Sequence, residues 1–362
     1  MTRSKIRILY TIPNFDTAGS GKVVYDLVKG LNPDLFEVFI LCHHSKGLFF
    51  KEVEALGVPI HFLQTTVPLR PYLSLYSRLQ PYRNFIKTHQ IDVVHSWHWS
   101  SDWTEILAAR LGGARYVYTK KAMNWGNIHW KIKSFLADWI VTINADMHAF
   151  FPYKKQQKLI PIGLDMDVYS RKHFPQMPSS GTFRILTVAN LVPVKNIELL
   201  LEAMYLLRDL NIELHIVGDS ETPYAAFLQE QVLRLGLSER VVFTGKQVDV
   251  RPLLAQADLE VMCSHHEGLG MALLEAMSLE VPVLGSDVPG INFILKDFPE
   301  YRFESGNASE LAQKISYFYN LNSAERQAIG VALRTYATTH FSLASFIAQH
   351  EVLYRQLAQN RR

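Results

Sequence analysis

Two carboxylates flank a glycine-rich turn in the run Ser-His-His-Glu-Gly-Leu-Gly-Met-Ala-Leu-Leu-Glu at residues 264–275. The residues before it predict a short strand, and those after it predict a helix over 271–279. A glycine turn that opens a helix is an anion site, because unpaired amides and the positive end of the helix dipole face the ligand. Glu267 and Glu275 accept hydrogen bonds from hydroxyls. The predicted ligand is therefore a phosphate that carries a polyol, such as a nucleotide sugar.

A lysine follows the first predicted strand of the same half of the chain. The strand over 183–189 leads through Asn190 to Lys195, which precedes the next predicted helix. The helix dipole disfavours a cation at this position, so a solvated loop lysine is the simpler interpretation of Lys195 in isolation. Because Glu267 and Glu275 are predicted on the same sheet edge, we favour a lysine that holds a diphosphate and neutralises the leaving group.

Several other predicted strands of this half end in glycine. Gly218 follows the strand 213–217, Thr244 and Gly245 follow 241–243, and a Gly-Ser-Asp-Val-Pro-Gly run occupies 285–290. Each fits an ordinary strand-to-helix turn, and each also fits a backbone contact to the donor. Both interpretations stay open, with Thr244 and Gly245 as candidates for the nucleobase pocket.

In the first half, the loop 16–22 follows the first strand. A Walker A loop would need Gly at 16 and Ser or Thr at 23, where this chain has Asp16 and Val23. A dinucleotide-binding fingerprint would need Gly at Val24. The broken patterns disfavour an NTPase or a dehydrogenase. We expect Gly19 and Gly21 to direct a helix N-terminus toward a donor phosphate or an acceptor.

A histidine- and tryptophan-rich run, His-Ser-Trp-His-Trp, occupies 95–99 at the end of another predicted strand. A structural role and a sugar-binding role are equally consistent with it. We expect His98 to contact a sugar hydroxyl, and Trp97 or Trp99 to stack on a sugar face. No metal-ligand pattern accompanies these histidines, so a metal-free site is preferred.

The segments 70–83 and 120–133 combine cations with aromatic residues, the second including Lys120, Lys121 and Trp125. Such segments suit an anionic acceptor or an anionic membrane surface, while a helix with a solvated basic face is the simplest alternative. Nothing in them resembles a nucleic-acid reader, so no nucleic-acid partner is expected.

Composition and periodicity predict how these residues are positioned. A chain of 362 residues with 48% hydrophobic and 20% charged residues suits two globular domains. Short apolar segments alternate with helical ones in both halves, which predicts parallel strands with helical crossovers. Strands are predicted over 7–13, 37–42, 59–63, 92–96, 116–119, 139–143 and 158–162, and then over 183–189, 213–217, 241–243, 259–263 and 281–284.

Charge and targeting signals bear on the compartment. Residues 1–170 contain 20 Lys/Arg and 13 Asp/Glu (+7), and the remaining 17 and 21 give −4 over 171–362, which predicts different partners for the two halves. No apolar run approaches the roughly 18 residues of a membrane helix, and the start lacks a signal-peptide pattern. Cys42 and Cys263 are expected to be buried thiols. We expect a cytoplasmic protein, with a peripheral position on the inner face of the cell membrane left open.

The pair Glu267 and Glu275, with Ser264, Gly268, Gly270 and the Lys-Asn dipeptide at 195–196, resembles glycosyltransferase family 4, the retaining "glycosyl transferases group 1". The resemblance covers nearly the whole chain and is strongest over 184–290. It implies the α/β GT-B fold, in which two Rossmann-like doubly wound parallel-sheet domains face across a cleft and a C-terminal helix crosses back to the N-terminal domain. The implied domains are 1–163 with 341–362 for the acceptor, a linker at 164–181, and 182–340 for the nucleotide-sugar donor.

The resemblance also implies roles for individual residues. Glu275 would bind the nucleotide ribose, Glu267 the sugar hydroxyls, and Lys195 the diphosphate, with Lys195, Glu267 and His98 as the catalytic set. The donor-binding set adds Gly19, Gly21, Asn190, Gly218, Thr244, Gly245, Gly268, Leu269, Gly270 and Met271. The acceptor-binding set is His95, Trp97, His98, Lys120, Lys121 and Trp125. Enzymes of the family require no metal, cofactor or enzyme nucleophile. The acceptor hydroxyl attacks the sugar on the same face as the leaving phosphate, so that the phosphate can take the acceptor's proton.

Four positions depart from the family pattern. Asn190 stands where an arginine often pairs with the lysine, Leu269 replaces a frequent aromatic residue, and Trp97 is the second member of the usual His-x-His. The common Gly-Gly near the N-terminus is Ala-Gly-Ser-Gly at 18–21. One cationic donor contact is therefore missing, and either His95 or His98 could take the histidine's role.

The sequence thus predicts a retaining hexosyltransferase-type enzyme that moves a sugar from a nucleoside diphosphate to a hydroxyl of a glycan or lipid-linked acceptor, in bacterial surface polysaccharide synthesis. Two alternatives stay open. One is a nucleotide-sugar epimerase with the same fold, and the other is a non-catalytic protein that binds nucleotide sugars.

Overall fold

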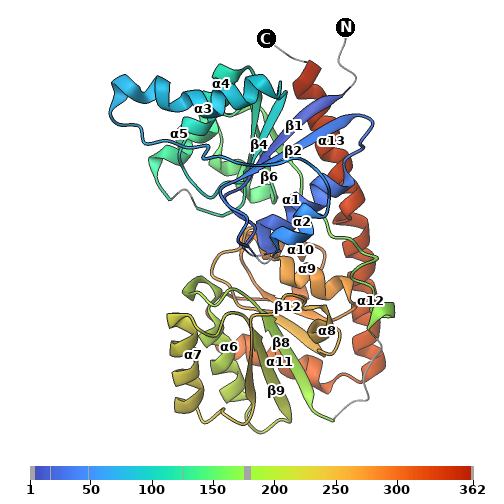
Figure 1. The fold of residues 1–362 in the computed structure, drawn as a ribbon. Helices are drawn as coiled ribbons and strands as arrows, with labels where there is room; N and C mark the ends of the chain where they lie inside the picture. Colours follow the sequence, from blue (N-terminus) through green and yellow to red (C-terminus); the bar gives the residue numbers. More distant parts are fainter. Residues whose placement is uncertain (1–4, 17, 48, 125, 175–180, 360–362) are drawn as a thin grey trace. The chain divides into compact units, whose positions relative to one another are not determined.

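The computed structural model describes residues 5–16, 18–47, 49–124, 126–174 and 181–359 (Figure 1). The chain divides into two compact units, Met1–Ile162 with Leu343–Arg362 (unit 1) and Gly163–Ser342 (unit 2). Among the described residues, no helix is both long and apolar enough to cross a membrane.

Unit 1 contains a seven-stranded sheet in the order β3-β2-β1-β4-β5-β6-β7, with every neighbouring pair parallel. The order reverses between β1 and β4, where a doubly wound sheet opens its ligand crevice at the carboxyl ends of the strands. The strands are β1 (Ile6–Thr11), β2 (Phe36–Cys42), β3 (Ile60–Phe62), β4 (Val93–Ser96), β5 (Arg115–Lys120), β6 (Trp139–Thr142) and β7 (Gln157–Leu159). The α-helices are α1 (Ala18–Gly30), α2 (Phe50–Glu54), α3 (Leu75–Thr88), α4 (Thr104–Gly112), α5 (Ile128–Leu136) and α13 (Leu343–Gln359).

The C-terminal helix α13 packs on the sheet of unit 1, where it contacts β1, β4 and α1. Its buried Tyr354 lies with its hydroxyl 2.9 Å from the hydroxyl of Tyr10 and 2.6 Å from Nδ1 of His95. The predicted return of the last helix to the first domain is therefore confirmed, and buried polar contacts fix its register.

Unit 2 contains a six-stranded sheet in the order β10-β9-β8-β11-β12-β13, again parallel throughout. Its order reverses between β8 and β11. The strands are β8 (Phe183–Val188), β9 (Ile212–Val217), β10 (Val241–Gly245), β11 (Leu259–Met262), β12 (Val283–Ser286) and β13 (Arg302–Phe303). The α-helices are α6 (Ile197–Leu206), α7 (Pro223–Arg234), α8 (Arg251–Leu254), α9 (Met271–Ser278), α10 (Pro289–Ile294), α11 (Ala308–Asn320) and α12 (Ser323–His340).

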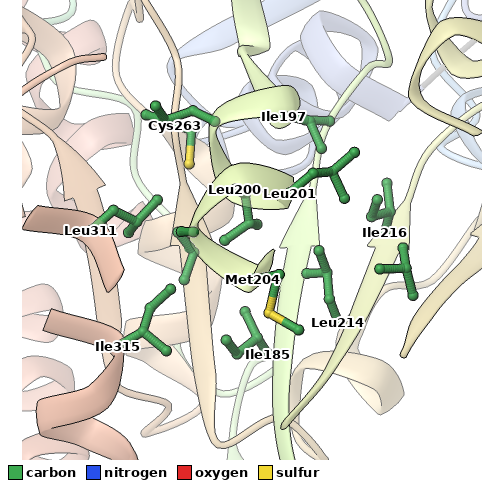
Figure 2. Close-up of a cluster of buried hydrophobic side chains, with 14 of the residues drawn as sticks. Ile185, Ile197, Leu200, Leu201, Met204, Leu214, Ile216, Cys263, Leu311 and Ile315 are labelled. Carbon is green, nitrogen blue, oxygen red and sulfur yellow. The ribbon is translucent and has the colours of Figure 1, made fainter. Parts of the chain in front are cut away.

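Branched and aliphatic side chains from the strands and from α6 and α11 form the core of unit 2 (Figure 2). Ile185 and Leu214 on adjacent strands meet Leu200 of α6 and Leu311 of α11, and all four side chains are fully buried. This core holds β8 and β11 in place, so the loops at their carboxyl ends start from rigid positions.

The predicted fold class is confirmed, with two doubly wound parallel sheets. The two-residue strand β13 and the helices α11 and α12 were not predicted from the sequence. A strand of two residues carries too little periodicity to recognise. The helix α11 packs on α6 and β13, and α12 packs on α9; both follow the last glycine-rich turn and contain no candidate site residue.

Candidate functional site

The turn between β11 and α9 is built around two glycines. Gly270 caps α9 in the left-handed region at φ +86°, which a side chain would strain. Gly290, at the start of α10, lies directly against the turn, since a Cβ atom there would be 2.5 Å from the carbonyl oxygen of Glu267. These glycines fix the path of the backbone, so the first amides of α9 and the side chain of Glu267 have a defined position.

Lys195 and Glu267 meet in unit 2, although 72 residues separate them. The ammonium Nζ of Lys195 donates to Oε2 of Glu267 at 2.7 Å, and the two side chains are 18% and 16% exposed. The amide of His265 donates to the carbonyl of Val194 at 2.8 Å, which joins the two loops. The structure thus combines a cation, a carboxylate and a helix N-terminus in a half-buried site, as a sugar-bearing diphosphate requires.

Glu275 of α9 contacts the first segment of unit 2, near Tyr169. The hydroxyl of Tyr169 donates to Oε1 of Glu275 at 3.1 Å. Burial, and then the charge of Glu275, raise the pKa of Tyr169, so this hydroxyl keeps its proton. Arg334 holds the segment by donating to the carbonyls of Tyr169 and Met166 at 2.8 and 3.0 Å. Tyr169 was missed because it lies in the predicted linker, and no local pattern marks it.

Replacing Glu275 with glutamine is expected to weaken binding of a free nucleoside diphosphate by about 10- to 100-fold, the cost of a lost hydrogen bond to a charged group. Turnover should fall less, because the ribose contact that the family resemblance implies for Glu275 would be made in both the ground state and the transition state. Calorimetric titration of the wild type and of Glu275→Gln measures the dissociation constant. Tyr169→Phe, which keeps the carboxylate, should give a smaller loss, and an unchanged constant for Glu275→Gln would refute the ribose assignment.

Four other predicted donor residues, Asn190, Gly218, Thr244 and Gly245, lie at the carboxyl ends of β8, β9 and β10. A Cβ atom on Gly218 would lie 2.3 Å from the carbonyl of Ala189, so glycine permits the contact between these two turns. The amide of Gly218 donates to the carbonyl of Gly245, and Thr244 Oγ1 donates to the carbonyl of Ile216, at 3.1 and 3.3 Å. Asn190 is exposed on the first turn, Leu269 is buried, and Met271 and Gly268 are half-buried.

The carboxyl group of Glu260, which was not among the predicted site residues, lies between β8 and β11, where the strand order reverses. Glu260 is fully buried, and its Oε1 accepts from the amide of Val188 at 3.1 Å. Its Oε2 has no partner among the described residues. Burial, with a smaller effect of Glu275, raises the pKa of Glu260 well above its usual range. A charged residue inside an otherwise apolar strand was the signal available in the sequence.

Glu260→Gln is expected to make unfolding less sensitive to pH. A raised folded-state pKa means that the wild type is at full stability below the ordinary glutamate pKa and loses stability as pH rises toward the folded-state value. Glutamine imitates the neutral acid, so the variant should be more stable than the wild type at pH 8 and equal to it in mild acid. Thermal unfolding across this range, with the exposed Glu230→Gln as control, tests the sign, and parallel curves would contradict it.

In unit 1 a buried glutamate connects three strands. Glu105, in the first turn of α4, accepts hydrogen bonds from Thr11 Oγ1, Ser96 Oγ and the Tyr116 hydroxyl at 2.5, 2.9 and 2.6 Å. The buried ammonium of Lys133 lies 3.9 Å away. Burial would raise the pKa of Glu105, but His98, Lys133 and the hydroxyl donors lower it overall, so the group stays ionised.

His98 lies beside this carboxylate, with Nε2 4.0 Å from Glu105 Oε1 and 3.2 Å from Thr65 Oγ1. Burial lowers the pKa of His98 to about 4, so the ring is neutral at physiological pH. A neutral imidazole can accept one hydrogen bond and donate another. His98 therefore has the protonation state that its predicted contact with a sugar hydroxyl needs, but its side chain is only 3% exposed in this structure.

The remaining predicted acceptor residues differ in exposure. His95 is buried between Tyr354 and Thr119, with its two ring nitrogens 2.6 and 2.7 Å from their hydroxyls, and Trp97 is fully buried. These two side chains present no surface to a ligand in this structure, whereas Trp99 is 62% exposed. Trp125 lies outside the described residues.

Two lysines line the same region of unit 1. Lys121 lies with its Nζ 4.0 Å from the centre of the Trp99 ring and donates to the carbonyl of Trp97 at 2.6 Å. Lys120 donates to the carbonyl of Asn124, and burial lowers its pKa to about 8. Among the described residues, no three His, Cys, Asp or Glu side chains gather as metal ligands.

The predicted glycine loop of unit 1 opens α1. Gly19 has non-helical dihedral angles (φ −17°, ψ −109°), and a Cβ atom on Gly21 would lie 3.1 Å from the ring of Phe15. The helix therefore starts with a kink, and Gly21 lets its first turn pack closely on Phe15.

Comparison with known proteins identifies the family. Residues 170–334 match the family "Glycosyl transferases group 1", and residues 17–151 match "Glycosyltransferase Family 4". The chain belongs to glycosyltransferase family 4. Its two parallel sheets therefore form the framework of a glycosyltransferase of this family.

Relatives of this family-4 chain include a glycosyltransferase of O-antigen biosynthesis. The putative glycosyltransferase EpsD of Bacillus subtilis is 25% identical over 77% of this chain and 85% of that protein. The O-antigen biosynthesis glycosyltransferase WclY of Escherichia coli is 24% identical over 86% of this chain and 88% of that protein. The N-acetyl-alpha-D-glucosaminyl L-malate synthase of Bacillus anthracis is 27% identical, and the match spans about half of each chain (53% and 51%).

Solved structures share the GT-B fold of this glycosyltransferase. A glycosyltransferase from Rickettsia africae matches with a TM-score of 0.87 at 19% identity, over 99% of this chain and all of the other. HepE from Anabaena, solved in complex with UDP and glucose, matches with a TM-score of 0.80 at 19% identity, over 97% of this chain and all of the other. At these identities, the similarity shows the fold alone.

Proposed function

We propose that this chain is a retaining, hexosyltransferase-type glycosyltransferase that moves a sugar from a nucleoside diphosphate to a hydroxyl of a glycan or lipid-linked acceptor in bacterial surface polysaccharide synthesis. The observation that carries the proposal is the 2.7 Å contact of Lys195 with Glu267 beside the N-terminus of α9. WclY, by its name a glycosyltransferase of O-antigen biosynthesis, supports the pathway, and HepE, solved with UDP-glucose, supports the class of donor.

The proposed reaction breaks the bond between the anomeric carbon and the β-phosphate oxygen while the acceptor oxygen bonds to the same face of that carbon. The acceptor's proton moves to the leaving phosphate, so the products are a glycoside and a nucleoside diphosphate. Negative charge grows on the leaving phosphate, where the ammonium of Lys195 and the first amides of α9 stabilise it. The proposal assigns no role to a metal or cofactor.

The proposal gives separate roles to the carboxylates of unit 2 and to residues of unit 1. Glu267 would accept hydrogen bonds from sugar hydroxyls once the diphosphate has taken over its partner Lys195, and Glu275 would bind the ribose. His98, Lys120 and Lys121 would contact the acceptor. The proposal places the enzyme in the cytoplasm, in peripheral contact with an anionic membrane and without a nucleic-acid partner.

A thermal-shift panel of UDP, GDP, ADP and their sugar conjugates tests donor binding, because a ligand that binds only the folded protein raises its melting temperature. A donor with a labelled sugar then tests transfer. Label that reaches an added glycan with retained anomeric configuration supports the proposal. Label that returns as an isomeric nucleotide sugar would make the chain an epimerase, and binding without turnover would make it a non-catalytic receptor.

A further inference from the structure

One end of the helical layer of unit 1 exposes large apolar side chains. Leu73, in the 3₁₀ turn η1 (Tyr72–Ser74) just before α3, is fully exposed, and its neighbours Tyr72 and Tyr76 are 65% and 52% exposed. Arg70 lies over the ring of Tyr72 and Arg83 over the ring of Tyr76, with the guanidinium carbons 5.8 and 5.7 Å from the ring centres. We call these five residues the α3 tip. Apolar surface of this kind, bordered by polar groups, marks an interaction site.

Hydrogen bonds from a single arginine side chain fix the backbone of the turn in the α3 tip. The guanidinium of Arg78 donates to the carbonyls of Pro68, Leu69 and Pro71, the last at 2.7 Å. The half-buried Arg78 thus holds the loop before η1, and Leu73 lies on the outer side of this turn. A side chain held in the exposed position loses little further entropy when a partner covers it.

The α3 tip lies on the same edge of unit 1 as the predicted acceptor residues. Right-handed crossovers place α3, α4 and α5 on one face of the sheet, with their N-termini at the carboxyl ends of the strands. The amide of Val67 donates to Thr104 Oγ1 at 3.0 Å, which joins the loop before η1 to the start of α4. Trp103 Nε1 donates to His129 Nδ1 at 3.3 Å, which joins the loop after β4 to α5. Exposed Trp99 and Ile128 lie on these connected segments.

The charge of this layer selects the partner. Residues 55–91, which include the α3 tip, contain four Lys/Arg and no Asp or Glu. A surface that combines exposed Leu73, Tyr72 and Tyr76 with the exposed cations Arg70 and Lys87 fits the boundary of an anionic bilayer, where aromatic rings lie among headgroups and cations meet lipid phosphates.

We propose that the α3 tip docks this protein on an anionic phospholipid bilayer, with Leu73 entering the acyl boundary and Arg70 and Arg83 contacting lipid phosphates. The inference extends the proposed function by naming the surface that meets the membrane. It also gives a lipid-linked acceptor a short route from the bilayer to the edge of unit 1 that carries His98 and Lys121.

Co-sedimentation with vesicles tests the proposal. The wild type should bind vesicles of phosphatidylglycerol and phosphatidylcholine in equal parts and should not bind phosphatidylcholine alone. Leu73→Asp should reduce binding about tenfold or more, because it removes a fully inserted leucine. Arg70→Gln should reduce binding about fivefold, as expected for one cation near an anionic surface. Leu233→Asp is the matched control and should bind like the wild type, since Leu233 is a 71% exposed leucine on α7 of unit 2.

Wild-type protein that stays in solution with anionic vesicles, or Leu73→Asp that binds as well as the wild type, would overturn the proposal. Binding to a soluble anionic polysaccharide but not to vesicles would do the same and would indicate a glycan surface. The nucleotide thermal shift, measured on the same preparations, is independent because the donor residues lie in unit 2. Wild-type protein that shows the nucleotide shift but does not bind anionic vesicles refutes the docking surface alone, and wild-type protein that binds vesicles without a nucleotide shift refutes the proposed function alone.

Discussion

Lys195→Ala is expected to lower turnover about 10²–10³-fold, the usual effect of removing one preorganised group that stabilises developing charge. The lysine is held in place before any ligand arrives, by its 2.7 Å contact with Glu267 and by the contact of Val194 with His265. Removing the ammonium also leaves the negative charge of the Glu267 carboxylate without its cationic partner, so that this carboxylate would repel the donor phosphates. Both effects act where the leaving group gains charge, so the turnover number should fall more than nucleotide affinity.

Steady-state transfer assays with Lys195→Ala and Lys195→Arg measure this effect, and Lys314→Ala serves as a control. Lys314 is on α11 of the same unit, where it pairs with Glu310 at 3.8 Å. Arginine keeps the charge and should recover part of the lost rate. A loss below about threefold for Lys195→Ala would exclude a leaving-group role, given the magnitude typical of such groups.

Glu105→Gln is expected to lower the free energy of unfolding of unit 1 by about 3–5 kcal/mol, the cost of breaking a buried ion pair from one side. The substitution leaves the fully buried ammonium of Lys133 without its carboxylate, because His98, with a pKa of about 4, carries no charge at neutral pH. For a unit of this size the loss corresponds to a fall of roughly 10 °C in Tm. Thermal unfolding followed by circular dichroism measures it, with the exposed Glu54→Gln as control.

The pH dependence of the same variant gives a second measurement. The folded-state pKa of Glu105 lies below the ordinary glutamate value, so its stabilising effect is complete above that ordinary value and disappears as pH falls through the folded-state pKa. The difference in Tm between the wild type and Glu105→Gln should therefore shrink in acid. A difference that is constant with pH would mean that the charge of Glu105 does not stabilise the fold.

Much of the donor half-site could be predicted because its signals are local. The glycine turn before α9 and the strands on either side occupy a single run of sequence, and alternating strands and helices already imply parallel sheets. Parallel topology then brings the carboxyl ends of β8 and β11 together. That rule placed Lys195 near Glu267 without any coordinate, and the structure confirms their contact at 2.7 Å.

The sequence does not show how deeply a side chain is buried or which distant residue it contacts, and only the folded structure gives this information. The two tryptophans at 97 and 99 have the same local pattern, yet Trp97, which directly follows β4, is fully buried, while Trp99, two residues further into the loop, is 62% exposed. Tyr169 reaches Glu275 across 106 residues.

The sequence by itself therefore determined the fold class and the chemistry of the donor turn, since residue type and short-range periodicity encode both. The tertiary structure decided which side chains are ionised, exposed or held in place. Glu105 and Glu260 are both fully buried glutamates, but Glu105 faces Lys133 and three hydroxyl donors, while Glu260 has one amide donor. Solvation and neighbouring charge, which depend on the packed surroundings, drive their pKa values in opposite directions.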